Sequence, residues 1–363
     1  MKQVSRGLSK PVAFFAALAI LVAGAATTTI QAEEWHATVG AESPDRGSQA
    51  QAFLPNELWI HINDSIKWTF PTHERHTISF LKSGQIRPPN FQTGSPFGVL
   101  VGCPGVTPDG PGLPIPSFDN SACVTSDVLL VPEDEEPGPM TTPTYSVTFP
   151  AAGNFKFVCL VHADMTGVVH VLNQSEALPH DPEFYDQQAQ REQARLLADA
   201  SRLQGQAAAV TQGAQSNQVA AGIGQITTTG VGSRTASLMR FRRETIVVQV
   251  GDTVEWTNLD PSISHTITFG TEPTDPRPPV NVLLSNGTVL LKDGNTRQAV
   301  INSTADRVNS GFLSATPQDR ANLAQATPNV IRFRVTFTSP GIFNYICAIH
   351  DQLGMKGTVI VHP

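Results

Sequence analysis

Short runs in which apolar and polar residues alternate recur through most of the chain. Clear examples are residues 246–250, 253–257 and 331–337, which are rich in Val, Ile, Thr and Phe. Gly, Pro, Asn and Asp separate these runs, as is typical of short strands joined by turns. A β-sandwich buries alternate residues between two sheets. The pattern therefore predicts an all-β fold of the sandwich type.

The pattern changes between residues 173 and 235. Asp181-Pro182-Glu183 has the composition of a helix start, with a capping carboxylate, a proline at the first helical position and an acid in the first turn. We expect a helix from there to Gly205, a candidate C-terminal stop. The stretch that follows is small, polar and weakly periodic, as expected of a linker. Its Ala and Gln content equally allows the helix to continue.

The N-terminus has the features of an export signal. Lys2, Arg6 and Lys10 precede an apolar run over 11–26, and small residues follow up to Ala32. The alternative is a retained membrane anchor, but the run is shorter than the ~20 residues of a spanning helix. We therefore expect residues 1–32 to be a cleaved signal peptide. The mature protein would be periplasmic or secreted, with no stable membrane insertion.

The chain contains an internal repeat. Residues 53–64 align without a gap on 241–252, and each copy is followed by a tryptophan strand, around Trp68 and Trp256. His-Thr-Ile, Arg-Pro-Pro and Val-Thr-Phe motifs then follow in the same order in both copies. Self-similarity of this kind fixes the number of domains. We expect domain 1 over 33–172, a partly helical linker over 173–235 and domain 2 over 236–363.

The charge of the chain argues against nucleic-acid binding. The 363 residues are 15% charged, with a net charge of -7. This gives no basic footprint for nucleic acid.

Candidate metal ligands occur once in each repeat. A histidine after the tryptophan strand precedes a C-terminal string with Cys, His and Met, and both strings are followed by a glycine. A thiolate, two imidazoles and a weak thioether form the ligand set of a blue-copper electron-transfer site. The two candidate sets are His76, Cys159, His162 and Met165, and His265, Cys347, His350 and Met355.

These strings resemble those of the cupredoxins, the plastocyanin/azurin family. The second spacing, Cys-x2-His-x4-Met, is similar to plastocyanin and pseudoazurin, and the shorter first one, Cys-x2-His-x2-Met, to amicyanin. The resemblance implies two tandem Greek-key sandwiches, each with one type 1 copper. It also implies that His162 and His350 are the more exposed ligands and the electron exit points. His73 has no counterpart in the second repeat, and we expect it at the surface.

The remaining two cysteines bracket an insertion rich in Gly and Pro. In an oxidising compartment, Cys103 and Cys123 are expected to form a disulfide. A separate metal site at this pair is the alternative, but no histidine lies nearby.

The expected function is electron transfer between redox proteins such as cytochromes or other cupredoxins, without catalysis. The alternative is a copper oxidoreductase, similar to nitrite reductases or small multicopper oxidases, with a type 2 copper built from scattered histidines. Against it, no histidine flanks Cys159 or Cys347. Copper storage or delivery is a third, less favoured function. The scattered histidines are His36, His61, His170, His180 and His362.

Overall fold

The computed structural model describes Met1 and residues 32–85, 87, 109, 113–212, 217–277, 280–282, 290–292, 296–315 and 330–363. Contacts within the chain separate Met1–Gln31 from Ala32–Pro363, and the folded elements all belong to the second unit. The predicted signal peptide lies outside the described residues apart from its two ends, and so does Cys103 of the predicted disulfide. In the described part, no helix has the length and apolar character needed to cross a membrane.

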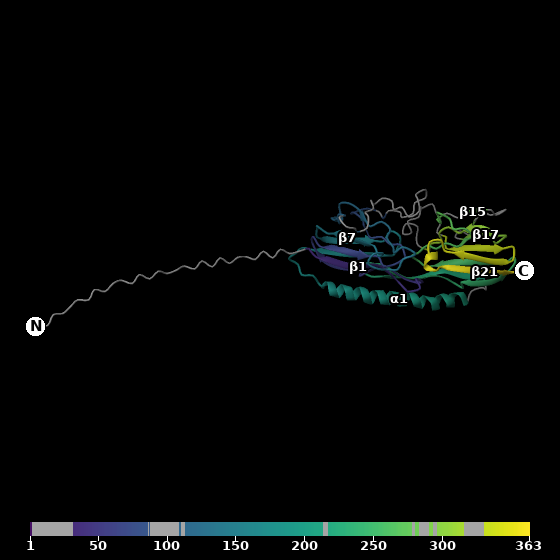
Figure 1. The fold of residues 1–363 in the computed structure, drawn as a ribbon, viewed down its shortest axis with the longest axis horizontal. Coiled ribbons are helices and arrows are strands. Elements are labelled where there is room, and N and C mark those ends of the chain that lie inside the picture. The colour runs from purple at the N-terminus through teal and green to yellow at the C-terminus, as the bar shows by residue number, and fades with distance from the viewer. Residues whose placement is uncertain are drawn as a thin grey trace. The chain divides into compact units, whose positions relative to one another are not determined.

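The described residues of the first half contain nine strands, of which β1 and β7 are labelled in Figure 1. They are β1 (Glu34–Glu42), β2 (Ser48–Leu54), β3 (Glu57–His61), β4 (Ser65–Thr69), β5 (Ser79–Phe80), β6 (Val124–Thr125), β7 (Thr144–Thr148), β8 (Gly153–Val158) and β9 (Thr166–Leu172). β7, β4, β1 and β2 lie in one sheet, and β3, β9, β8, β5 and β6 form the other.

The second half repeats this plan after helix α1 (Pro182–Gln212). Its elements are β10 (Gln218–Thr228), β11 (Ser233–Arg242), β12 (Thr245–Gln249), β13 (Thr253–Leu259), β14 (Thr268–Phe269), β15 (Val280–Val282), β16 (Leu290–Lys292), β17 (Thr296–Ile301), β18 (Arg307–Asn309), β19 (Arg332–Phe337), β20 (Gly341–Ile346), the 3₁₀ turn Asp351–Leu353 and β21 (Lys356–His362). The parallel pairs β1/β4 and β3/β9 recur as β10/β13 and β12/β21.

One sheet is shared by both halves. β2 pairs antiparallel with β11, so the described strands β16, β17, β19, β13, β10, β11, β2, β1, β4 and β7 form one continuous sheet in that order. Except for Leu238, the residues paired across this junction are small or polar, with Ala236 opposite Ala50 and Ser237 opposite Gln49. The two sandwiches are therefore joined by backbone hydrogen bonds.

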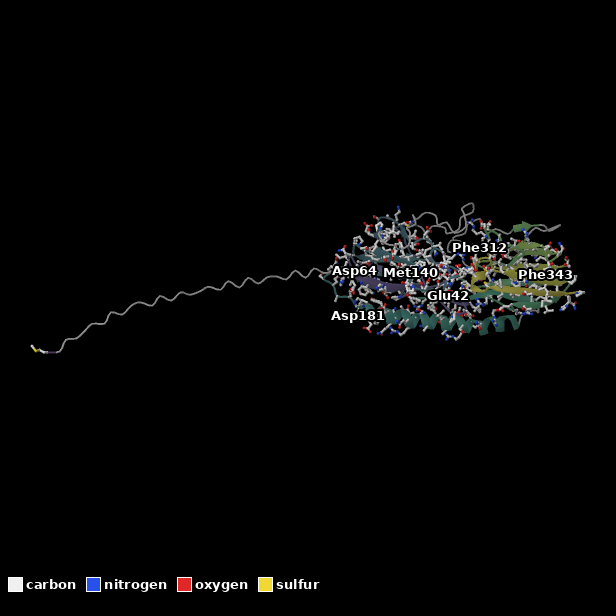
Figure 2. All side chains as sticks on the ribbon, viewed as in Figure 1. Glu42, Asp64, Met140, Asp181, Phe312 and Phe343 are labelled. Atoms are coloured by element: carbon white, nitrogen blue, oxygen red, sulfur yellow. The ribbon has the colours of Figure 1, made fainter. Side chains whose placement is uncertain are left out.

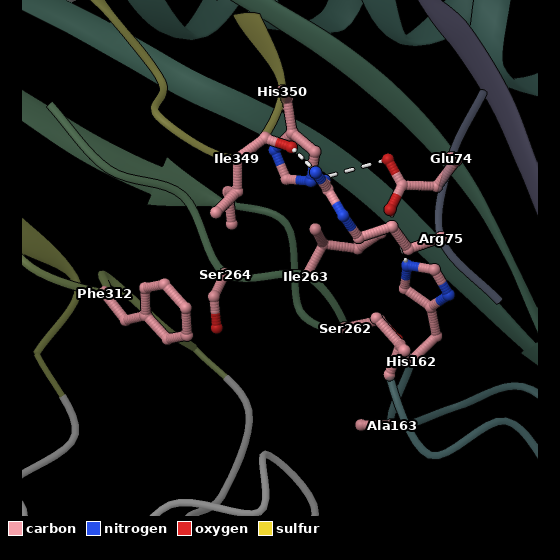
Figure 3. Close-up of a pocket in the computed structure, with 11 residues that line it drawn as sticks. Glu74, Arg75, His162, Ala163, Ser262, Ile263, Ser264, Phe312, Ile349 and His350 are labelled. Atoms are coloured by element: carbon pink, nitrogen blue, oxygen red, sulfur yellow. Dashed lines mark hydrogen bonds and ion pairs between the residues drawn. The ribbon is translucent and has the colours of Figure 1, made fainter. Parts of the chain in front are cut away.

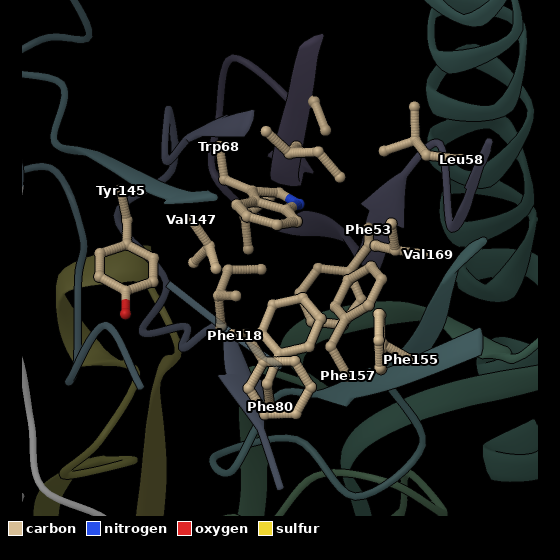
Figure 4. Close-up of a cluster of buried hydrophobic side chains, with 14 of the residues drawn as sticks. Phe53, Leu58, Trp68, Phe80, Phe118, Tyr145, Val147, Phe155, Phe157 and Val169 are labelled. Atoms are coloured by element: carbon tan, nitrogen blue, oxygen red, sulfur yellow. The ribbon is translucent and has the colours of Figure 1, made fainter. Parts of the chain in front are cut away.

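Each half has its own aromatic core, which confirms the predicted sandwich fold. In the first half, Trp68, Phe80 and Phe157 pack with ring centroids 5.3 to 5.8 Å apart (Figure 4). Trp256 has the corresponding position in the second core and packs on Tyr345 at 5.2 Å. Both tryptophans are fully buried. The copper-ligand cysteines and methionines predicted from the sequence are members of these cores.

The helix predicted from Asp181 is confirmed at its start. The Asp181 carboxylate accepts a hydrogen bond from the Phe184 amide at 2.9 Å, as an N-cap should, and the residue lies at the beginning of the helix (Figure 2). The predicted stop at Gly205 is wrong, because α1 continues to Gln212. Its apolar residues Leu196 and Ala200 pack against alanines of β2 and β11, so tertiary contact stabilises the helix.

The linker expected over 173–235 is only partly a linker. β10 and the start of β11 lie inside it, and β10 pairs with β11 and β13 within the second sandwich. The β-branched residues of β10 are interrupted by Ala, Gly and Gln, and the strand has no aromatic residue, so the strand signal is weak. Its small residues fit because α1 packs closely on this part of the shared sheet: Ile223 contacts Leu203 of the helix.

Candidate metal centres

The structure brings three of the four predicted ligands together in each half. We call His76, Cys159, His162 and Met165 the first site, and His265, Cys347, His350 and Met355 the second site. Within each site the nitrogen and sulfur donor atoms of the two histidines and the cysteine lie within 4.8 Å of one another. All six side chains are buried. In the described part of the chain, no other group of three or more His, Cys, Asp or Glu residues has this arrangement.

Both histidines of a site direct the same ring atom, Nδ1, to the centre. In the first site, His162 Nδ1 lies 3.2 Å from His76 Nδ1 and 3.6 Å from Cys159 Sγ. In the second, His350 Nδ1 lies 3.1 Å from His265 Nδ1 and 3.3 Å from Cys347 Sγ. Two imidazoles and a thiolate directed at one buried point are a favourable arrangement only around a cation. The residues present therefore fit a copper ion.

The methionines are placed by the backbone of the ligand loops. The Cys159 amide donates to the Met165 carbonyl at 3.0 Å, and the Cys347 amide donates to the Met355 carbonyl at 3.1 Å. Both methionine side chains are fully buried in the same core cluster as the cysteine of their site. The two backbone hydrogen bonds bring the end of each ligand loop back to its cysteine. The axial role of the two thioethers stays a prediction.

A threonine after the first histidine holds the cysteine in both sites. The Thr77 amide donates to Cys159 Sγ at 3.4 Å, and its hydroxyl accepts from the Leu160 amide at 2.8 Å. Thr266 makes the same two contacts with Cys347 Sγ and the Ala348 amide, at 3.3 and 2.7 Å. An amide donor to sulfur stabilises the thiolate form and tunes a bound metal.

Glycines on β1 and β10 lie against the first histidines. Gly40 and Gly222 have φ values of +74° and +72° and interrupt the register of their strands. A Cβ atom at either position would collide with the Nε2 atom of His76 or His265. Sequence reasoning missed both glycines, because the β1 and β10 segments do not align visibly in the repeat.

Arg87, the arginine of the first Arg-Pro-Pro motif, contacts the loop that carries Cys159 and His162. Its guanidinium donates to the backbone carbonyls of Cys159, His162 and Ala163. It thereby holds the first ligand loop from outside. The recurrence of Arg-Pro-Pro in both halves drew attention to this arginine, but the sequence did not show which groups its guanidinium contacts.

Burial changes the proton affinities of the ligands. It lowers the pKa of His76 and His265, which keeps these imidazoles in the neutral form that binds metal. For Cys159, burial opposes ionisation, but the charge and hydrogen bond of His162 outweigh it and hold the pKa well below its usual range. Burial dominates at Cys347 and raises its pKa to about 11. A bound cation would displace that proton, because cysteine coordinates as thiolate.

His162 and His350 were expected to be the more exposed ligands, and both are nevertheless buried. They are 2% and 3% exposed, because the two ligand loops face each other across the junction of the halves. They line a cavity of about 50 Å³ together with Glu74, Arg75 and Ile263 (Figure 3). His73 is also buried rather than at the surface. Its Nδ1 lies 2.5 Å from the Glu42 carboxylate and its Nε2 2.8 Å from the Glu135 carbonyl.

The other histidines do not gather into a further centre. His61 contacts the Glu176 carbonyl at 2.8 Å, and His170 lies between Asn154 and Glu57. His180 stacks on Phe184.

Comparisons with known proteins agree with this chemistry. A model of the family described as "Copper binding proteins, plastocyanin/azurin family" matches residues 227–362. No curated protein matches the chain.

Solved structures with local likeness include three copper proteins. Plastocyanin from Dryopteris crassirhizoma is 18% identical over 40% of this chain and 99% of its own, with a TM-score of 0.20. A purple cupredoxin from Nitrosopumilus maritimus is 21% identical over 40% and 98%, with a TM-score of 0.20. A copper-containing nitrite reductase from Thermus scotoductus SA-01 is 12% identical over 91% and 68%, with a TM-score of 0.20. TM-scores this low do not establish a common overall arrangement.

The family assignment follows from the matched segment and the geometry together. Residues 227–362 contain the complete second site and most strands of the second sandwich. Residues 227–362 therefore match the plastocyanin/azurin family of copper-binding proteins, and the first half repeats the sandwich and the group of two histidines and one cysteine.

Proposed function

We propose that this protein is an exported electron carrier that binds one type 1 copper at each site and exchanges electrons with redox proteins such as cytochromes or other cupredoxins. The observation that carries the proposal is the duplicated group of two imidazole Nδ1 atoms and one cysteine sulfur, each with a buried methionine in the same loop. Copper bound by such a set changes oxidation state with little movement of its ligands.

The protein's own residues supply the rigidity that this function needs. The first histidine of each site is fixed at its backbone: the amides and carbonyls of His76 and Leu129 exchange two hydrogen bonds, as do those of His265 and Leu313. The threonine contacts fix the cysteines, and the sandwich cores exclude water from both sulfurs. A ligand set that cannot relax has a small reorganisation energy, which favours fast electron transfer.

The alternative, a copper oxidoreductase with a type 2 centre, finds less support. A catalytic copper needs imidazole ligands and an open coordination position. The non-ligand histidines are dispersed, and several have other partners. We therefore propose carriage of electrons without conversion of a small substrate.

Serine substitutions of the two cysteines test the proposal. The intense visible absorption of a type 1 centre requires the bond between copper and thiolate. Cys159→Ser and Cys347→Ser should each remove roughly half of this absorption, because the two sites have equivalent donor sets. Copper content and the electron paramagnetic resonance spectrum of each variant identify the centre that remains. If either substitution leaves the colour unchanged, that site is not a type 1 centre.

A further inference from the structure

Glu74 lies between the two copper-binding sites. It belongs to the loop after β4, two residues before His76, and its side chain is 2% exposed. One carboxylate oxygen lies 3.4 Å from His162 Nε2 and the other 3.6 Å from His350 Nε2 (Figure 3). A single acid from the first half therefore reaches a ligand of each site.

The chemistry of the two contacts follows from the orientation of the rings. His162 and His350 direct Nδ1 at their cysteines, so Nε2 carries the proton when the imidazole binds metal. Metal-bound histidines commonly donate this second N–H to a carboxylate, which orients the ring and makes the ligand more basic. Glu74 supplies this carboxylate to both sites at once.

The acid is not part of the repeat. Ile263 occupies the corresponding position two residues before His265, so the second half brings no acid of its own. Neighbouring contacts hold the two ligand loops against this residue. Arg75 donates to the Ile349 carbonyl at 3.1 Å, and the Asp164 amide donates to the Ser262 hydroxyl at 3.2 Å.

We propose that Glu74 is a shared positioning residue that couples the two sites into one electron-exchanging pair. The inference rests on the proposed function. Its carboxylate lies at ion-pair distance from Nε2 of His162 and of His350, favours the oxidised state at both sites, and provides the path between them. That path crosses two imidazole rings and one carboxylate, with through-space steps of 3.4 and 3.6 Å. One electron leaves the reduced site and enters the oxidised site, and no proton is required.

The test is the Glu74→Gln variant, measured in three forms of the full chain: with both sites, with Cys159→Ser and with Cys347→Ser. Loss of the negative charge should raise the midpoint potential of the site that remains in each single-site form. We expect a change on the order of tenfold in the preference for the oxidised state, or about 59 mV for a one-electron couple. In the two-site form, re-equilibration between the sites after flash reduction should slow by about tenfold or more, because the charged contact between the carboxylate and both rings is lost.

Two further variants separate charge from structure. Glu74→Asp keeps the charge and should shift the potentials less than Glu74→Gln. Glu42→Gln removes a partly buried carboxylate of β1 that contacts His73, a neighbour of Glu74 in the chain, and no ion pair joins Glu42 to a predicted copper ligand. This variant should leave both potentials unchanged. If Glu74→Gln does not fold, the rate of electron exchange in Glu74→Asp is compared with that of the wild type. Shortening the side chain should slow the exchange between sites, and an unchanged rate would overturn the inference.

Failure of this inference differs from failure of the proposed function. If a single-site form with wild-type Glu74 has no type 1 spectrum, the proposed function fails. If both spectra are present and Glu74→Gln leaves the potential of the second site unchanged, Glu74 is not shared and the inference is overturned. Equal shifts in the glutamine and aspartate variants, or an unchanged exchange rate in the glutamine variant, also overturn it.

Discussion

Gly40 and Gly222 show how much of each site depends on residues that are not ligands. Both adopt a left-handed backbone conformation that favours glycine, and both leave space for the imidazole of the first histidine. Among the described residues, the Nε2 atoms of His76 and His265 have no hydrogen-bond partner. Contact with these glycines, rather than a polar partner, therefore fixes the orientation of the first histidine.

We expect Gly222→Ala to abolish the absorption of the second site and to leave that of the first site intact. The added methyl group would strain the backbone by roughly 1–2 kcal/mol and would also displace the His265 ring. Gly251→Ala is the matched control, since its φ is +91° but its Cβ would meet nothing within 4 Å. The control should lose stability and keep both absorption bands. Visible spectra and thermal unfolding of the two variants check this, and a Gly222→Ala protein with unchanged bands would contradict it.

At this scale the sequence predicted the ligands and not their surroundings. Cys347, His350 and Met355 are close in sequence, so their spacing alone reports one loop. Glu74 carries no such signal, because its partner His350 lies 276 residues away in the other half. His73 and the two exit histidines were expected at the surface because nothing local indicates that the two loops face each other.

At the scale of elements, α1 connects the halves. Leu196 and Ala200 pack on the alanines of β1, β2 and β11, and Leu203 packs on Ile223 and Leu238. The Arg234 guanidinium also lies 2.9 Å from Glu192 of the helix. A helix with few apolar residues therefore covers the one part of the shared sheet where small side chains allow close approach.

Leu196→Ala should lower the free energy of unfolding by about 2–5 kcal/mol, the usual cost of truncating a buried leucine. Leu196 is 3% exposed and lies in the centre of the contact with β2 and β11. The neighbouring Leu197 is only partly buried, and Leu197→Ala should cost less than half as much. Urea unfolding of both variants measures the difference. Equal losses would mean that the packing of α1 on the shared sheet does not depend on this face.

The elements that sequence analysis missed have a common physical cause. The strands around Trp68 and Trp256 were predicted because they carry β-branched and aromatic residues that alternate with polar ones. β10 is rich in Ala, Gly and Gln because α1 packs above it, so its composition reflects the neighbouring helix rather than its own backbone. Tertiary packing overrides intrinsic propensity at such positions.

At the scale of the whole chain, Ala32–Pro363 forms one unit rather than two tethered sandwiches. The β2/β11 pairing and the facing ligand loops place both sites at one junction. The sequence repeat predicted two equivalent halves but contained no information on this junction, because a repeat reports what the two halves share and not how one half contacts the other. Glu74 and Arg75 occupy positions where the second half has Ile263 and Ser264.

We expect the protein to carry electrons through this junction without converting nitrite or oxygen. Both methionines are buried beside their cysteines. If they are the axial ligands that the sequence predicts, neither site has the open position that a catalytic metal requires. Outside the two sites, His61 lies within hydrogen-bond distance of the Glu176 carbonyl, and His170 of the Asn154 and Glu57 side chains. Copper-loaded protein mixed with a small reductant and either substrate should be reduced and then show no sustained turnover. Turnover that survives removal of extraneous metal, and that disappears when His61 or His170 is replaced, would instead require a type 2 centre formed by a rearrangement of these histidines.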